Sequence, residues 1–101
     1  MSYAELELKI IRWSEDRKII PNSTVTHQFM KGTSEWGELA DAILKGDQEK
    51  LVDSVGDVMV CLINACALAD IDLVECMAHA YEEIKDRRGH LTPEGVFVKE
   101  E

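Results

Sequence analysis

A row of polar side chains between residues 28 and 38 has the types and the spacing that phosphate or metal chemistry needs. Gln28, Lys31, Glu35 and Glu38 are three, four and three residues apart, so on a helix they lie along one stripe. Two carboxylates at this spacing repel each other by roughly a few tenths of a kcal/mol, and by more where water is excluded. The repulsion favours a nearby cation, either Lys31 or a metal ion. A solvated acidic face is the alternative.

A second polar stripe follows on the next predicted helix. Lys50, Asp53, Asp57 and Asn64 are three, four and seven residues apart, and the other positions from 55 to 69 are almost wholly apolar. A helix that is apolar nearly all round is buried. A buried carboxylate is costly unless it is paired or bound to a metal ion, so Asp57 needs a partner.

Packing these two helices together would bring the carboxylates to one place. Mg²⁺ takes oxygen ligands and keeps some of its waters, so such a cluster suits a magnesium–phosphate site. Its predicted ligands are Glu35, Glu38 and Asp57, with Asp53 as a fourth. The alternative is a metal-free salt-bridge network in which Lys31 and Lys50 neutralise the acids.

The elements that must position these residues are helices. Apolar residues recur at helical spacing in segments bounded by capping residues such as Ser2 and Asp47 and by punctuating residues such as Pro21 and Gly46. We expect a single all-α domain, residues 1–101, with a four-helix bundle-like fold and a short extended C-terminal arm. The predicted helices span about residues 2–17, 24–45, 48–69 and 73–88, the last ending at Gly89.

Composition narrows the class of partner. The chain has 101 residues and a formal net charge of −9, which repels nucleic acid unless cations intervene. The longest apolar run, residues 58–69, contains Asn64 and is shorter than the roughly 20 residues of a membrane span. The N-terminus lacks a basic stretch followed by an apolar one, so we expect a cytoplasmic protein that binds neither nucleic acid nor membrane. We interpret Cys61, Cys66 and Cys76 as small core residues.

The ordered set of motifs resembles a known family. Glu35-x-x-Glu38, then Gly56-Asp57 leading into an apolar helix, is similar to the MazG-like all-α nucleoside triphosphate pyrophosphohydrolases, whose signature is E-x-x-E followed by E-x-x-D. Trp13, Gln28-x-x-Lys31, the basic stretch 84–89 and the ending 95–101 extend the resemblance to small phage-type members. One departure is Ser54, which stands where the second motif opens with glutamate.

The resemblance implies an activity and a set of roles. Such proteins hydrolyse NTPs or dNTPs to the monophosphate and pyrophosphate with Mg²⁺, for which Mn²⁺ can substitute. It implies Glu35, Glu38 and Asp57 as catalytic metal ligands and Asp53 as a fourth ligand, with Glu38 positioning the attacking water. Triphosphate contacts are expected from Lys31, Lys50, Lys85 and Arg88, and base and sugar contacts from Trp13, Gln28, Asn64 and Tyr81.

Other interpretations stay open at this level. Lys85 and Arg88 would also suit a helix C-terminus without any ligand. Four helices give a thin core, so we expect a homodimer or homotetramer with sites near subunit interfaces. The alternatives to an enzyme are a non-catalytic nucleotide or metal sensor, for which Ser54 is the motivating residue, and a helical protein-interaction module.

Overall fold

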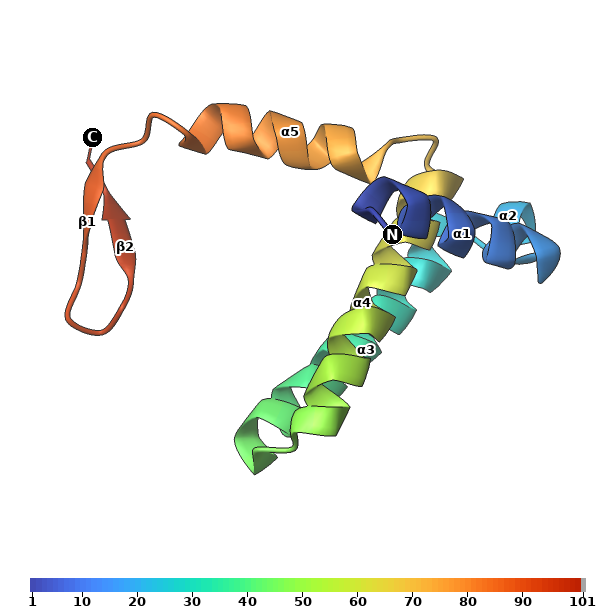
Figure 1. Cartoon of the computed structure of the whole chain (residues 1–101), viewed down its shortest axis with the longest axis horizontal. Coiled ribbons are helices and arrows are strands. Elements are labelled where there is room, and N and C mark those ends of the chain that lie inside the picture. The colour runs from blue at the N-terminus through green and yellow to red at the C-terminus, as the bar shows by residue number, and fades with distance from the viewer. Residues whose placement is uncertain (101) are drawn as a thin grey trace.

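The chain folds into helices with one small hairpin at its C-terminal end (Figure 1). The computed structural model describes residues 1–100. The helices are α1 (Tyr3–Asp16), α2 (Ile19–Asn22), α3 (Val25–Lys45), α4 (Gln48–Leu68) and α5 (Leu73–Ile84), and the strands are β1 (Gly89–Leu91) and β2 (Phe97–Lys99). The predicted all-α fold class is confirmed. The short α2 was not predicted, and it fills the turn after the left-handed residue Lys18 (φ 64°).

Capping side chains set the helix boundaries. Ser2, Thr24, Asp47 and Asp72 each accept a hydrogen bond from a backbone N–H in the first turn of the helix that follows, which satisfies one of the free donors there. Gly46 adopts a left-handed conformation (φ 66°) between α3 and α4, as a helix-ending glycine does. The loop that joins these helices is therefore short, and it turns the chain back on itself.

Helices α3 and α4 form an antiparallel pair, and α1 and α2 pack across one end of it (Figure 1). The small core at this end contains Ile63, Cys66 and Leu73, with Ile10 and Ile11 of α1 packed against it. By length and composition alone α4 is apolar enough to cross a membrane. The central helix of a soluble protein passes the same test, so this property does not place the chain in a bilayer.

The segment from α5 onward leaves this body. Helix α5 makes hardly any contact with the other helices, and Figure 1 shows it leading to the β1–β2 hairpin at the far end of the molecule. The radius of gyration is 16.4 Å, larger than the about 13 Å of a compact domain of 100 residues. We call α1–α4 the body and residues 73–100 the arm.

The arm corrects three expectations. Helix α5 ends at Ile84, with Lys85 as its C-cap, instead of reaching residue 88. Gly89 is not a helix cap. It begins β1, where an added Cβ would clash with the backbone carbonyl oxygen of Val98, so this strand pairing needs glycine. The ending is extended as predicted, and its two strands form an antiparallel hairpin with Gly89 opposite Lys99. Cys61 and Cys66 are buried as expected, whereas Cys76 on α5 is exposed.

Candidate functional site between helices α3 and α4

The facing surfaces of α3 and α4 are built from small and polar side chains. Gly32 lets the helices approach closely, since a Cβ added there would lie 3.3 Å from Cys61 Cβ. On α4, Ser54, Cys61 and Asn64 are buried and Asp57 is partly buried, at spacings of three, four and three residues that place them on one face. Asp57 therefore lies on the side of α4 that faces α3.

A pocket of about 450 Å³ opens at this contact and is lined by residues from α1, α2, α3 and α4. Its volume lies within the roughly 300–1,000 Å³ typical of ligand sites. Half of the residues predicted for the site lie in its wall: Trp13, Gln28, Lys31, Glu35, Asp57 and Asn64. The remaining lining residues are Ile19, Val60 and Cys61.

The charged side chains of the pocket come from neighbouring turns of α3 and α4. Glu35 and Asp57 are partly buried, and Lys31 is exposed beside them. Burial raises the pKa of the Cys61 thiol; Lys31 opposes this shift, while Glu35 and Asp57 add to it. Among residues 1–100, neither Lys31 nor Lys50 forms an ion pair with an acid. The metal-free salt-bridge network is therefore not formed, and Lys31 remains available to a ligand.

The part of the pocket lined by Asn64 and Gln28 is polar and hydrogen-bonded. Asn64 accepts a hydrogen bond from the Ser14 hydroxyl at 2.6 Å, and its amide nitrogen donates to Gln28 Oε1 at 3.3 Å. Ser14 is fully buried, at 0 % exposure. Sequence reasoning did not single out Ser14. The available signal was a polar residue next to Trp13 that continues the partly buried face of Ile10 and Ile11.

Other predicted residues of the body lie outside this pocket. Glu38 is exposed and does not line it. Lys50 and Asp53 line a separate shallow hollow at the start of α4. The residue on the α3-facing side of α4 is Ser54, which is 2 % exposed. Ser54, and not Asp53, therefore occupies the position one turn before Asp57 that faces the site.

Comparison with known proteins identifies the family of this chain. A model of the MazG nucleotide pyrophosphohydrolase domain matches residues 26–92, two thirds of the chain. The chain belongs to this family. It is also 34% identical over 70 residues to an uncharacterized 18.2 kDa protein, encoded in the rep-hol intergenic region of Haemophilus phage HP1. That alignment covers 69% of this chain and 43% of the phage protein, so the chain spans less than half of that relative. No solved structure is significantly similar to this chain.

The MazG match covers α3 and α4 with all the predicted acids, whereas Trp13 and Ser14 lie outside the matched residues. Proteins of this family act as nucleotide pyrophosphohydrolases with a divalent metal ion. Within residues 1–100, no three acidic, histidine or cysteine side chains are grouped closely enough to hold a metal. The carboxylates of Glu35 and Asp57 in one pocket still fit Mg²⁺, which is often bound by one or two carboxylates and completed by phosphates and water.

Three predicted substrate contacts of this MazG chain lie on or after α5, away from the pocket. Tyr81 is 61% exposed on α5. The Lys85 ammonium pairs with Glu82 Oε2 at 2.8 Å, and Arg88 is exposed near the hairpin. The arm leads these residues away from the pocket of their own chain (Figure 1).

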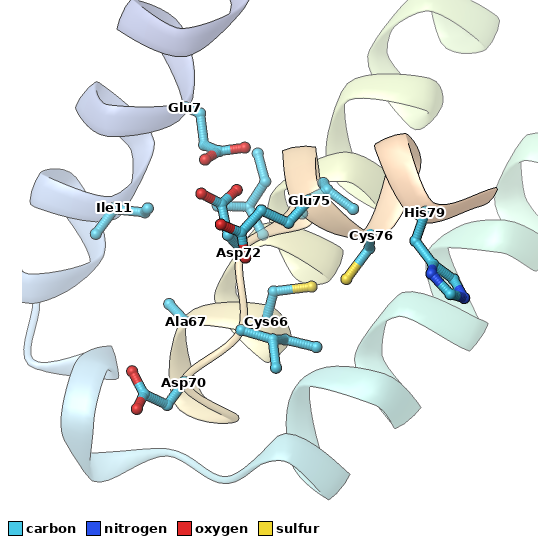
Figure 2. A pocket seen from close by; sticks show the side chains of 12 residues that line it. Glu7, Ile11, Cys66, Ala67, Asp70, Asp72, Glu75, Cys76 and His79 are labelled. Carbon is cyan, nitrogen blue, oxygen red and sulfur yellow. The ribbon is translucent and has the colours of Figure 1, made fainter. Parts of the chain in front are cut away.

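A larger pocket, of about 660 Å³, lies where α1, α4 and α5 meet. Figure 2 shows the carboxylates of Glu7, Asp72 and Glu75 gathered in it. Its lining includes Asp70 as well and contains no lysine or arginine. This pocket would repel a triphosphate, so the smaller one between α3 and α4 is the better candidate for the nucleotide.

Proposed function

We propose that this MazG protein is a Mg²⁺-dependent hydrolase that splits NTPs or dNTPs between the α- and β-phosphates, releasing a nucleoside monophosphate and pyrophosphate. One observation carries the proposal: a single pocket holds the carboxylates of Glu35 and Asp57, the ammonium group of Lys31 and a polar end beside Trp13. These are the groups that a metal-bound triphosphate and an attached base require.

The pocket has two chemically different ends. Along α3 the lining runs from Gln28 to Glu35, and along the antiparallel α4 it runs from Asn64 to Asp57. Seven residues of helix span about 10 Å, so both helices carry an amide at one end and a carboxylate at the other. We therefore place the triphosphate at the Glu35–Asp57 end and the base at the Asn64–Gln28 end.

At the acidic end each side chain has a defined task. Glu35 and Asp57 would hold the divalent ion, and either Mg²⁺ or Mn²⁺ suits their hard oxygen donors. When bound, such an ion neutralises phosphate charge and lowers the pKa of a coordinated water. Lys31, exposed and without an ion pair among residues 1–100, would bind the phosphate oxygens. Glu38 and Asp53 lie outside the lining of the pocket and remain ligands predicted from the sequence alone, with Glu38 also predicted to orient the attacking water.

At the other end, Trp13 gives the base a surface to stack on. Trp13 is 46% exposed, and the Arg17 guanidinium lies 5.0 Å from the centroid of its ring, an arrangement that holds the indole by a cation–π contact. The nearby Gln28 and Asn64 amides can hydrogen-bond a base edge. The acidic chain would not bind duplex nucleic acid, and the substrate would be a free cytoplasmic nucleotide.

A second copy would complete the site. We propose a homodimer or dimer of dimers in which the arm of one chain covers apolar surface of another. The apolar groove between α3 and α4, about 270 Å³ and lined by exposed Phe29, Trp36 and Leu62, offers such a surface. This arrangement would bring Tyr81, Lys85 and Arg88 of one copy toward the pocket of its neighbour. Light scattering at micromolar concentration tests it, and a monomeric mass would contradict it.

The direct assay of the reaction uses Mg²⁺ and a panel of eight NTPs and dNTPs. Pyrophosphate release that EDTA abolishes, with formation of the monophosphate, is the expected result. Release of orthophosphate instead, or the absence of any product from all nucleotides, would reject the proposed reaction.

A second candidate function is a nucleotide sensor that binds without turnover. Ser54 favours it, because this serine is buried on the site-facing surface where the family signature has a glutamate. The Ser54→Glu variant separates the two functions. Nucleotide binding without pyrophosphate release, in both wild type and Ser54→Glu, would favour the sensor.

A further inference from the structure

A continuous chain of hydrogen bonds backs the base end of the pocket. Ser14 Oγ donates to Asn64 Oδ1, Asn64 Nδ2 donates to Gln28 Oε1, and Gln28 Nε2 donates to Ser23 Oγ at 3.1 Å. Asn64 is 2% exposed and Gln28 9%. The chain joins α1, α4, α3 and the loop before α3, so its members are held in fixed relative positions.

The two amides of this chain have hydrogen-bonding capacity left over. A carboxamide offers two N–H hydrogens and an oxygen with two lone pairs. The chain uses one hydrogen and one lone pair of Asn64, and the same of Gln28. Both residues line the pocket, whereas Ser14 and Ser23 stand behind them and do not. A ligand in the pocket therefore meets amides whose orientation is controlled from behind.

Both ends of the chain are hydroxyl groups, and a hydroxyl donates as readily as it accepts. If both amides turn over, Asn64 donates to Ser14, Gln28 donates to Asn64, and Ser23 donates to Gln28. Every hydrogen bond of the chain is kept. The same number of hydrogen bonds within the chain is therefore available in both directions, and the pocket can present N–H or C=O at the same position.

We propose that Ser14 and Ser23 are positioning residues that let Asn64 and Gln28 turn over together, so that the pocket binds base edges of opposite hydrogen-bonding polarity. This inference rests on the proposed function, which places the base at this end of the pocket. Uracil and cytosine are the matched pair of ligands, because their edges at positions 3 and 4 have reversed donors and acceptors.

The test fixes the direction of the chain. In Ser23→Asp the new carboxylate only accepts, so Gln28 must donate to it and the chain keeps one direction. The readout is the ratio of the calorimetric Kd values of α,β-methylene dUTP and α,β-methylene dCTP, with Mg²⁺, on full-length protein. These analogues resist cleavage between the α- and β-phosphates, so the ratio can be measured whether or not the protein hydrolyses nucleotides.

Wild type is expected to bind the two analogues within about tenfold of each other, and Ser23→Asp to change their ratio by at least about tenfold, because one edge then meets the wrong partner. Thr26→Asp is the matched control. It adds the same charge in the exposed first turn of α3, outside the chain, and should leave the ratio unchanged. General destabilisation would weaken both analogues alike and would not move the ratio.

Ser14→Ala provides a second, smaller change that keeps the test decisive if Ser23→Asp folds poorly. It removes the hydroxyl behind Asn64 and is expected to weaken both analogues by several-fold, through a less ordered amide. Unchanged Kd values in Ser14→Ala, an unchanged ratio in Ser23→Asp, or no binding of either analogue to wild type would each overturn the inference. Failure to hydrolyse dUTP and dCTP, with the ratio shift still seen, would reject only the proposed reaction.

Discussion

The body and the arm carry the same kind of amphipathic helix but bury it very differently. The body contains the buried residues of α1, α3 and α4, whereas Leu73 is the one buried residue between positions 73 and 100. On α5, Met77 is 46% exposed and Ile84 50%. Apolar spacing thus predicts a helix with an apolar face, but it does not say which surface covers that face.

The residues predicted for the site are also divided between the body and the arm. The body brings carboxylates, a lysine and amides into one pocket, while Lys85 and Arg88 of the arm stay away from it. Each Å² of apolar surface that stays in water instead of being buried forgoes about 25 cal/mol of stabilisation. The comparison therefore predicts that the body supplies the carboxylates, Lys31 and the amides of the site from one chain, and that the arm docks to another chain.

The largest expected effect concerns the pocket of the body. Asp57→Asn should lower kcat/KM for pyrophosphate release at least about 100-fold, because a neutral amide is a poor Mg²⁺ ligand and the metal supplies several kcal/mol of transition-state stabilisation. Asp41→Asn removes an exposed carboxylate of α3 that does not line the pocket, and should leave the rate nearly unchanged. Similar rates for both variants would remove Asp57 from the site.

The next largest effect is the difference in stability between a core substitution in the body and an apolar substitution in the arm. Ile63→Ala should lower the free energy of unfolding by about 2–5 kcal/mol, since Ile63 is 3% exposed in the body. Met77→Ala in the arm should cost less than about 1 kcal/mol in dilute protein, where the arm is undocked. Urea unfolding at two protein concentrations measures both. A cost for Met77→Ala that grows with concentration would support docking, and equal costs for both variants when dilute would contradict the comparison.

Thiol reactivity gives a smaller difference between the regions. Burial raises the pKa of the Cys61 and Cys66 thiols, so less thiolate forms at pH 8 and both react slowly with iodoacetamide. Cys76 of the arm is exposed and should react at least about ten times faster in dilute protein. Both thiol pKa values lie above the ordinary value of about 8.5. The labelling rates of Cys61 and Cys66 should therefore keep rising as the pH is increased beyond about 8.5. Peptide mass spectrometry measures the labelling of each cysteine, and slow labelling of Cys76 would show that the arm is covered.

The smallest expected effect lies within α3. Gly37→Ala should raise the free energy of unfolding by about 0.5–1 kcal/mol, the usual gain of alanine over glycine in a helix, because nothing lies within 4 Å of the added Cβ. Gly32→Ala has the same intrinsic gain but meets Cys61 Cβ at 3.3 Å, and should lose most of it. Equal effects in thermal unfolding would mean that α3 and α4 do not pack closely at Gly32.

Sequence reasoning succeeded where a residue's role depends on its own helix. The periodicity predicted the long helices, and capping residues such as Asp47 act as expected. Glu35, Glu38 and Asp57, with Asp53, were predicted to converge on one spot; Glu35 and Asp57 line one pocket, whereas Glu38 and Asp53 do not. Reasoning failed for the arm, because neither the early end of α5 at Ile84 nor the close approach of Gly89 to the Val98 backbone follows from local helical spacing.

The sequence by itself determined the all-α class, the helix caps and the two polar stripes, because these depend on side chains within a turn or two of one another. Only the tertiary structure decided which side of each stripe faces the partner helix. A step of one residue turns a side chain by about 100° around the axis, and this places Ser54 toward the site and Asp53 outside it. The tertiary structure likewise joins Ser14 to Asn64, fifty positions apart in sequence, since such a contact arises only when α1 crosses α4.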